Sequence, residues 1–208
     1  MLNLPLEQLL PFVLAIIVAL SVHEFSHALA ADQLGDDTPR LQGRLTLNPL
    51  AHLDLLGSMM FVLAGFGWAR PVQINPYVIQ RRSPAGLMIV AAAGPFSNLF
   101  LALFATIPIR AGLITSSTPL FIIDFLGQFL WINLILLFFN LLPIFPLDGE
   151  KVLDYFLPPR GQEILRQIRP YGMYILMALL ILGNRGGFDI IGLLVRKPAE
   201  IIMGLLVP

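Results

Sequence analysis

Two of the chain's three histidines stand four positions apart in the segment His23-Glu24-Phe25-Ser26-His27, an H-E-x-x-H motif. Residues at i and i+4 share one face of a helix, about 6 Å apart along its axis. Two imidazole nitrogens at that spacing can reach one zinc ion at the usual bond length of about 2.0–2.1 Å. Glu24 can then act as general base on a water that the zinc activates. The motif predicts a hydrolytic zinc site; the alternative is a pair of hydrogen-bonded histidines in a packed core.

The composition around this motif is that of a membrane protein. The chain is 57% hydrophobic and 12% charged, with a mean hydropathy of +0.80, whereas soluble domains carry about 25% charged residues. Ionisable groups at membrane depth are costly and usually functional, which favours the metal site over the core pair. The zero net charge gives no indication of nucleic-acid binding. Because the chain has no cysteine, zinc must be held by histidines and carboxylates.

Three apolar segments predict membrane-spanning helices, because each is long enough to cross a hydrocarbon core about 30 Å thick. They run from about Leu9 to Ala31, which includes the motif, from Ala85 to Ile109, and from Phe121 to Phe139. For two later segments, the sequence does not decide whether they cross the membrane. Tyr171–Leu182 is short for a span, and Ile190–Val207 is interrupted by two basic residues and a proline.

The connection between the first two spans carries different patterns. Leu53–Gly67 is apolar but short, which favours a re-entrant segment. Arg44–Leu47 and Val72–Asn75 alternate apolar and polar residues as short strands do. The predicted fold is therefore an all-α polytopic membrane protein with a three-helix core, peripheral helices and a small β-sheet beside the re-entrant segment. We expect one membrane-embedded domain over residues 1–208, with its core at about 9–155 and C-terminal helices at about 156–208.

The third span ends in Asn140-Leu141-Leu142-Pro143-Ile144-Phe145-Pro146-Leu147-Asp148-Gly149. Its two prolines remove backbone donors and clash with the preceding turn, so the helix must unwind there. Irregular backbone at membrane depth is tolerated only where it is buried in protein or lines a watery cavity. Asp148 emerges from this break either as the N-cap of the next helix or as the third ligand of the predicted zinc site, and the H-E-x-x-H motif favours the ligand.

The basic residues predict how the chain is oriented. With three full crossings and a re-entrant Leu53–Gly67, the far ends of the first and third helices lie on one face. Before position 170, only Arg110 falls on the opposite face. The nine basic residues on the crowded face are Arg40, Arg44, Arg70, Arg81, Arg82, Lys151, Arg160, Arg166 and Arg169. The positive-inside rule makes that face cytoplasmic. A full crossing at Leu53–Gly67 would instead carry Asp148 to the face opposite His27.

These residues together resemble the site-2 protease family of intramembrane zinc metalloproteases. His23 to His27 is similar to the family's zinc motif, and Asn140 to Gly149 is similar to its Asn-x-x-Pro-x-x-Pro-x-Asp-Gly signature. Gly94-Pro95-Phe96-Ser97-Asn98 resembles the family's central Gly-x-x-x-Asn element. The segments at 43–52 and 68–72 read like the compact branch, which lacks PDZ and nucleotide-sensing domains.

The resemblance implies three core helices that hold one zinc through His23, His27 and Asp148, with Glu24 as base. It also implies proteolysis of transmembrane protein substrates on the cytosolic side of a lipid bilayer. We expect a multi-pass protein of a prokaryotic cell membrane whose active site opens to the cytoplasm.

Further polar residues are candidates for the transition state or the substrate. Asn140 and His52 could donate to the oxyanion of the attacked carbonyl, although Asn140 could instead satisfy carbonyls freed by the proline break. Asn98 is expected to form an interhelical hydrogen bond rather than a substrate contact. The strand-like segments around Leu45 and Ile74 could bind an extended peptide by strand addition.

Two other functions are compatible with parts of this pattern. A membrane metal-ion or proton transporter also uses intramembrane His, Asp and Glu, but inverted repeats with paired broken helices are expected there, and the chain has one broken helix and a single copy of each motif. A catalytically silent membrane protein is disfavoured because Glu24 is present.

Overall fold

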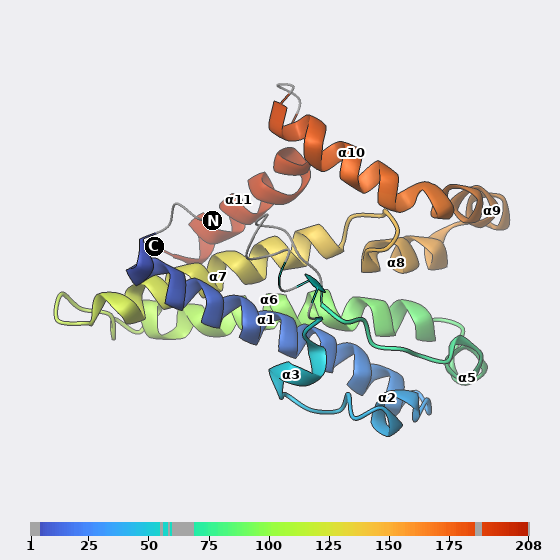
Figure 1. Ribbon diagram of the computed structural model, residues 1–208, viewed down its shortest axis with the longest axis horizontal. Coiled ribbons are helices and arrows are strands. Elements are labelled where there is room, and N and C mark those ends of the chain that lie inside the picture. The colour runs from blue at the N-terminus through green and yellow to red at the C-terminus, as the bar shows by residue number, and fades with distance from the viewer. Residues whose placement is uncertain (1–4, 55, 58, 60–68, 186–188, 208) are drawn as a thin grey trace.

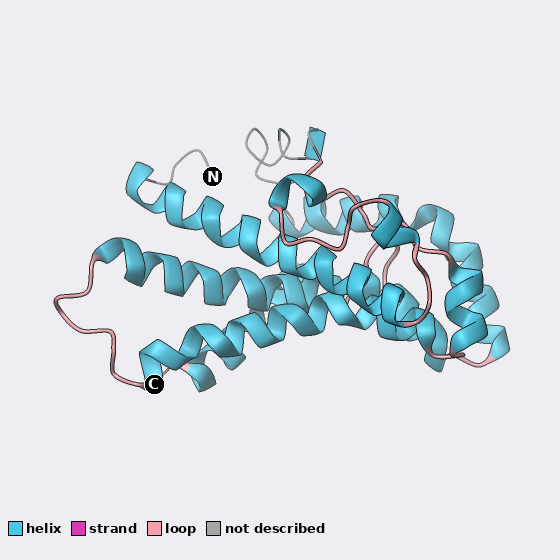
Figure 2. Ribbon diagram, turned by 90° about the horizontal axis from the view of Figure 1, so that it is seen from below, coloured by secondary structure: helices cyan, strands magenta, loops and turns pink. Residues whose placement is uncertain are grey.

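Three long apolar helices form the centre of the molecule, whose computed structural model describes residues 5–54, 56–57, 59, 69–185 and 189–207. They are α1 (Leu6–Gln33), α6 (Gly86–Arg110) and α7 (Leu120–Asn140). In Figures 1 and 2 they lie alongside one another with their axes along the longest dimension of the molecule. At 1.5 Å per residue, each is at least about 31 Å long, which matches a hydrocarbon core. The three predicted core spans are confirmed as helices.

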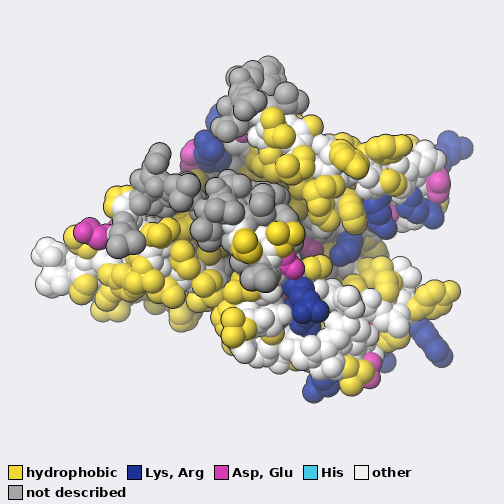
Figure 3. All heavy atoms as spheres, viewed as in Figure 1, with side chains coloured by type: hydrophobic (Ala, Val, Ile, Leu, Met, Phe, Trp, Pro, Cys, Tyr) yellow, Lys and Arg dark blue, Asp and Glu magenta, His cyan; other side chains and the backbone are white. Residues whose placement is uncertain are grey.

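Small side chains allow these helices to pack closely. Ala15 and Ala19 of α1 and Ala102 and Ala105 of α6 are buried in one apolar cluster with residues of α7 such as Leu130. Where both lipid and side chains are apolar, close backbone approach and van der Waals packing hold helices together. The outward faces remain apolar: Phe100 of α6, for example, is 70% exposed. Figure 3 shows such hydrophobic side chains along the flank of the three helices.

The chain direction brings both sequence motifs to one end of the bundle. Helices α1 and α7 run toward the right of Figure 1, and α6 runs back. The end of α1, the start of α6 and the end of α7 therefore meet at that side. The H-E-x-x-H motif, the Gly94–Asn98 element and the turn before Asp148 come from these three places.

Shorter helices follow the core. Helix α8 (Asp148–Phe156) begins at the proline-rich turn and leads to α9 (Pro159–Ile168), the 3-10 turn η1 (Arg169–Tyr171) and α10 (Gly172–Arg185). The C-terminal part comprises the π-helix η2 (Gly192–Arg196) and α11 (Lys197–Leu206), which packs against α7. Besides the three core helices, Pro159–Ile181 has the length and apolar composition of a fourth span within the described chain. The segment Tyr171–Leu182, whose crossing the sequence did not decide, thus lies largely within a longer helical stretch.

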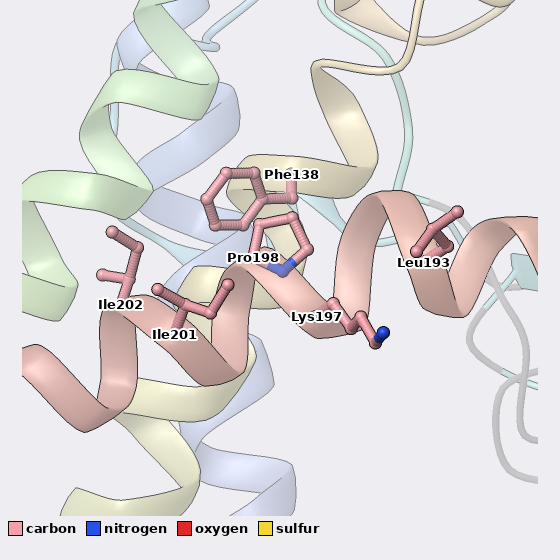
Figure 4. Close-up of a pocket in the computed structure, with 6 residues that line it drawn as sticks. All are labelled: Phe138, Leu193, Lys197, Pro198, Ile201 and Ile202. Atoms are coloured by element: carbon pink, nitrogen blue, oxygen red, sulfur yellow. The ribbon is translucent and has the colours of Figure 1, made fainter.

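An apolar groove of about 490 Å³ lies between α7 and the C-terminal helices. Figure 4 shows its lining, with Phe138 from α7 facing Pro198, Ile201 and Ile202 from α11. Lys197 is the one charged residue among its described lining residues. These described lining residues include no carboxylate or imidazole with which to hold a metal.

The predicted small β-sheet is wrong within the part of the chain that the structure describes. Arg44–Leu47 and Val72–Asn75 form no strand, and only an isolated bridge joins Leu53 to Ala69. The alternation at 72–75 has another cause: Val72 and Ile74 are half-buried, whereas Gln73 and Asn75 are exposed. An extended segment lying on helices produces this pattern without a partner strand. Most of Leu53–Gly67, the predicted re-entrant segment, lies outside the described residues.

Hydrogen bonds that involve side chains, rather than the backbone hydrogen bonds of a β-sheet, hold the connection between α1 and α6 in place. The Asn75 N–H donates to Oδ2 of the buried Asp36 at 2.6 Å, and the Gln42 amide donates to the Gln73 side chain at 2.9 Å. The connection contains the short helices α2 (Thr38–Leu41), α3 (Pro49–His52) and α5 (Pro76–Arg82). The consequence is an extended stretch, residues 71–75, that runs beside the end of α1.

Candidate metal centre

Three potential metal ligands meet at the end of the helix bundle. Nε2 of His23 and Nε2 of His27 are 3.1 Å apart, and each lies 3.2 Å from Oδ2 of Asp148. Both histidines are buried, and the Asp148 side chain is only 12% exposed. Asp148 stands more than a hundred residues after the two histidines in the chain, yet the three atoms form a nearly equilateral triangle of one oxygen and two nitrogens.

The size and chemistry of this triangle fit zinc. A tetrahedral ion with bonds of about 2.0–2.1 Å places its ligand atoms about 3.3 Å apart, close to the three observed separations. Nitrogen and carboxylate ligands are those that zinc accepts, and three protein ligands leave a fourth position for water, as in catalytic sites. Two imidazole lone pairs and a carboxylate oxygen facing one another also require a cation or a proton between them.

Hydrogen bonds determine which imidazole nitrogens face the triangle. Nδ1 of His27 lies 2.7 Å from the carbonyl oxygen of Val90, an acceptor, so this nitrogen must donate. Nδ1 of His23 lies 2.6 Å from Oδ1 of Asn98 in the same way. When a neutral imidazole donates through Nδ1, its Nε2 carries a lone pair. Both rings therefore present Nε2 as a ligand atom, the arrangement in which outer partners orient metal-binding histidines.

Helix α6 approaches the histidines closely at Gly94. A Cβ built on Gly94 would lie under 3.0 Å from Nε2 of both His23 and His27. Pro95 follows, and because proline has no N–H, the carbonyl of Ala91 loses its helical partner. Ala91 lines the same cavity as the histidines. The Gly-Pro pair thus makes room at the ligand triangle and frees one backbone acceptor beside it.

The turn before Asp148 is held against α7 and the C-terminal helices. A Cβ on Gly149 would lie under 3.0 Å from the carbonyl oxygens of Leu141 and Leu142, so only glycine allows this approach. Glu150 is 2% exposed and accepts hydrogen bonds from Nε and Nη2 of Arg169 in η1, the former at 2.8 Å. The backbone on either side of Asp148 is therefore fixed by contacts distant in sequence.

Burial by itself would raise the pKa of the Asp148 carboxyl, but when the imidazoles of His27 and His23 are protonated, their charge and their Nε2–H hydrogen bonds outweigh it and hold that pKa below its ordinary value. Asp148 is therefore an ionised carboxylate at neutral pH, the form in which it can bind a cation.

A cavity of about 150 Å³ opens beside the triangle. Glu24 lines it from α1, and Asn140 and Lys151 line it from the end of α7 and from α8. The remaining lining residues are His23, His27, Asp148, Pro71, Val72, Ile74, Val90, Ala91 and Pro146. One wall is thus the extended stretch at 71–75. The Glu24 carboxylate, the Asn140 amide and the Lys151 ammonium group come from residues that line the cavity beside the ligand atoms.

Not every predicted residue lies in this cavity. His52 is buried in the connection after α1, where its Nε2 donates to the carbonyl of Thr46 at 2.7 Å, and it does not line the cavity. The buried Arg44 donates nearby to the carbonyls of Ala51 and Arg70. His52 thus helps to fold the connection. Asn98 forms the predicted interhelical hydrogen bonds, which reach α1 and α7.

Sequence reasoning missed Lys151, Asn133 and the Val90 carbonyl. Lys151 stands three positions after Asp148, and i,i+3 residues share a helix face, so its position was a usable signal. Asn133 is a fully buried amide in a largely apolar span, which is also a signal. No pattern in the side chains could have indicated the carbonyl of Val90.

Sequence comparisons with known proteins give matches that together cover most of the chain. Residues 108–183, which include the turn and Asp148, match the family model described as peptidase family M50. The "Putative zinc metalloprotease YwhC" of Bacillus subtilis is 39% identical over 184 residues, covering 85% of this chain and 83% of the relative. The "Putative zinc metalloprotease Rip2" of Mycolicibacterium smegmatis is 33% identical over 199 residues, covering 90% and 74%. Rip2 of Mycobacterium tuberculosis strain H37Rv is 30% identical over 186 residues, covering 83% and 67%.

No solved structure matches the chain significantly. The relatives are named for zinc-dependent proteolysis rather than for transport, and their similarity extends over most of the chain. The chain is a membrane-embedded zinc metalloprotease that belongs to peptidase family M50, the site-2 proteases.

Proposed function

We propose that this protein is an intramembrane endopeptidase that hydrolyses peptide bonds within or near the transmembrane segments of other membrane proteins. The observation that carries the proposal is the His23–His27–Asp148 triangle, which lies in a cavity where three spanning helices meet. A hydrolytic site built into spanning helices acts most directly on a chain that enters from the membrane.

The proposed zinc ligands are Nε2 of His23, Nε2 of His27 and Oδ2 of Asp148. Zinc in this position would supply Lewis-acid activation of a water molecule and of the peptide carbonyl. Glu24 is adjacent to the first ligand on α1 and lines the cavity. We assign to its carboxylate the transfer of a proton from the attacking water to the leaving amine, which balances the hydrolysis.

Two donors can stabilise the developing oxyanion. Asn140 uses one N–H of its amide to bind the Leu136 carbonyl at 3.0 Å, which leaves the second N–H available. Lys151 brings an ammonium group to the cavity from the helix that carries Asp148. We assign the electrophilic role to Asn140 and Lys151 together and withdraw it from His52, which lies outside the cavity.

The substrate must bind as an extended chain, because the peptide bonds of a helix are shielded and already hydrogen-bonded. The extended stretch at 71–75 forms one cavity wall, and the Ala91 carbonyl, whose helical donor Pro95 cannot supply, belongs to a residue that lines the same cavity. These backbone groups suit a peptide bound by main-chain hydrogen bonds. On the strength of its basic residues, we place this side of the protein in the cytoplasm. On the strength of its bacterial relatives, we place the protein in a prokaryotic cell membrane.

Purified protein reconstituted with zinc and a panel of single-span substrates tests this function. Wild type should cleave, and mass spectrometry should locate the broken bond within or beside the apolar segment. Glu24→Gln should retain zinc but lose nearly all turnover. Glu7→Gln, an exposed change in the first turn of the same helix, is the matched control and should cleave normally. Normal turnover by Glu24→Gln, or cleavage confined to soluble tails, would refute the proposal.

A further inference from the structure

Helix α9 lies across the end of the bundle rather than along it. In Figure 1, α9 is seen nearly end-on at the right, where α1, α6 and α7 run across the picture. After the quarter turn of Figure 2, the helix at the same right-hand extreme runs up the picture, perpendicular to the long helices. Because the long helices cross the membrane, an axis perpendicular to them is parallel to the membrane plane.

The two faces of α9 differ in polarity. Ile164 and Ile168, at i and i+4, share one face and are 57% and 45% exposed. Glu163, Arg166 and Gln167 occupy the other face. None of the described side chains of α9 is buried in the protein. An exposed apolar face on a short polar helix is characteristic of helices that lie in a membrane interface.

Cations and aromatic side chains gather around this helix. Arg160 of α9 has no carboxylate partner among the described residues, and Figure 3 shows Lys and Arg side chains concentrated at this end of the molecule. Tyr171 and Tyr174, just beyond α9, are 63% and 75% exposed. Tyrosines of this kind favour the level of the lipid headgroups, and unpaired cations there attract anionic lipid.

We propose that α9 is an interfacial helix that docks onto anionic phospholipid headgroups of the leaflet at the Asp148 end of the bundle. Its isoleucines enter the boundary of the acyl chains, and the unpaired Arg160 binds the phosphates. The inference does not depend on the metal site, because it rests on the orientation, exposure and charge of α9 alone.

The elbow after α9 explains why Pro159–Ile181 does not cross the membrane as one straight helix despite its length. Pro170 lies in η1, and two hydrogen bonds from Arg169 to Oε1 of the buried Glu150 tie the elbow to α8. A Cβ on Gly172 would lie under 3.0 Å from the carbonyl oxygen of Phe145, so the start of α10 also touches the turn before Asp148. The surface that binds lipid is thereby joined to the backbone that carries Asp148.

Depth measurements on the intact, naturally cysteine-free protein test the orientation. Single substitutions Ile164→Cys, Ile168→Cys, Glu163→Cys and Gln167→Cys would be spin-labelled in lipid nanodiscs. Positions 164 and 168 should be accessible to oxygen and equal in depth, and positions 163 and 167 should be accessible to a water-soluble nickel chelate. A depth difference of about 6 Å between 164 and 168, the rise of four residues along a crossing helix, would overturn the proposal. Equal water accessibility of both faces would also overturn it.

Lipid selectivity tests the charge. A fluorophore at Ile168→Cys would be quenched by brominated phosphatidylglycerol or brominated phosphatidylcholine, which gives their relative local binding constants. The labelled protein with all other side chains as in the wild type should prefer phosphatidylglycerol. Arg160→Gln should reduce that preference about fivefold, the equivalent of about 1 kcal/mol per cation. Arg110→Gln, at the opposite end, is the control and should change nothing. Equal binding of the two lipids by the parent protein would refute the docking of anionic lipid.

Discussion

His23 and Asn98 are joined by a hydrogen bond of 2.6 Å between Nδ1 and Oδ1, and a carbonyl on a third helix determines its direction. The Phe129 carbonyl accepts from Nδ2 of Asn133 at 2.8 Å, so Oδ1 of Asn133 faces Asn98. Nδ2 of Asn98 donates to that oxygen at 2.9 Å, which turns Oδ1 of Asn98 toward His23. The chain of amides across α7, α6 and α1 thus sets the tautomer of His23 and leaves its Nε2 free for a metal.

Breaking this chain should weaken metal binding. Asn98→Ala removes the acceptor that orients His23, and loss of such an outer partner typically lowers metal affinity 10–100-fold. Competition with a chromogenic chelator measures the zinc affinity directly. Ser97→Ala, which removes only a local bond to the Gly94 carbonyl, should bind zinc as wild type does. An unchanged affinity in Asn98→Ala would mean that packing alone orients the ring.

Each ligand of the triangle should be required for zinc. We expect one zinc per chain in the wild type and loss of that zinc in His23→Ala, His27→Ala and Asp148→Ala, because two remaining ligands hold zinc weakly. Elemental analysis of purified protein provides the readout. Asp154→Ala on the same helix is the control and should keep its metal. Full zinc in Asp148→Ala would remove Asp148 from the ligand set.

Glycine at position 94 should be essential for the geometry of the site. In Gly94→Ala, the new methyl group would collide with Nε2 of both histidines, so we expect loss of zinc and of cleavage in a protein that still inserts into membranes. Gly127→Ala is a matched control on α7, where a Cβ would meet nothing within 4 Å. That variant should be neutral or more stable by up to about 1 kcal/mol, because alanine favours helix. Normal zinc content in Gly94→Ala would contradict the close approach.

The ion pair of Glu150 with Arg169 should stabilise the turn that carries Asp148. Arg169→Gln leaves a buried carboxylate without its partner, so unfolding in detergent should become easier by at least about 2 kcal/mol, less than for a fully buried pair because Arg169 is partly exposed. Arg166→Gln, which breaks the exposed pair with Glu163, should cost less than about 1 kcal/mol. Equal losses of unfolding free energy in the two variants would show that the buried pair stabilises the protein no more than the exposed pair does.

The orientation in the membrane can be read with single cysteines. Arg82→Cys and Lys151→Cys should react with an impermeant maleimide from the cytoplasmic side, and Arg110→Cys should react from the outside. The reason is that positions 82 and 151 lie on the face where the basic residues are concentrated. Inverted vesicles and intact cells provide the two accessibilities. Labelling of positions 82 and 151 from opposite faces would require an additional crossing and would separate His27 from Asp148.

The sequence by itself determined the chemistry and the three core helices. The H-E-x-x-H spacing and the proline break before Asp148 name the three ligand candidates, since helix periodicity and the missing donor of proline are local effects. Long apolar runs identify spanning helices because every backbone polar group in a bilayer must be satisfied within its own segment. These properties depend on neighbours in the chain.

Only the tertiary structure decided how those residues are held. The alternation at Val72 and Ile74 predicted a strand, but one-sided burial produces the same pattern, and strand pairing is a non-local choice. The Val90 carbonyl, the Asn98–Asn133 pair and the Glu150–Arg169 contact join residues far apart in the chain. Which groups meet across helices depends on the rotation and close approach of their backbones, here at Gly94 and Gly149. For the same reason, the direction of α9 across the bundle could not be read from its amphipathic pattern, which determines a face but not an orientation.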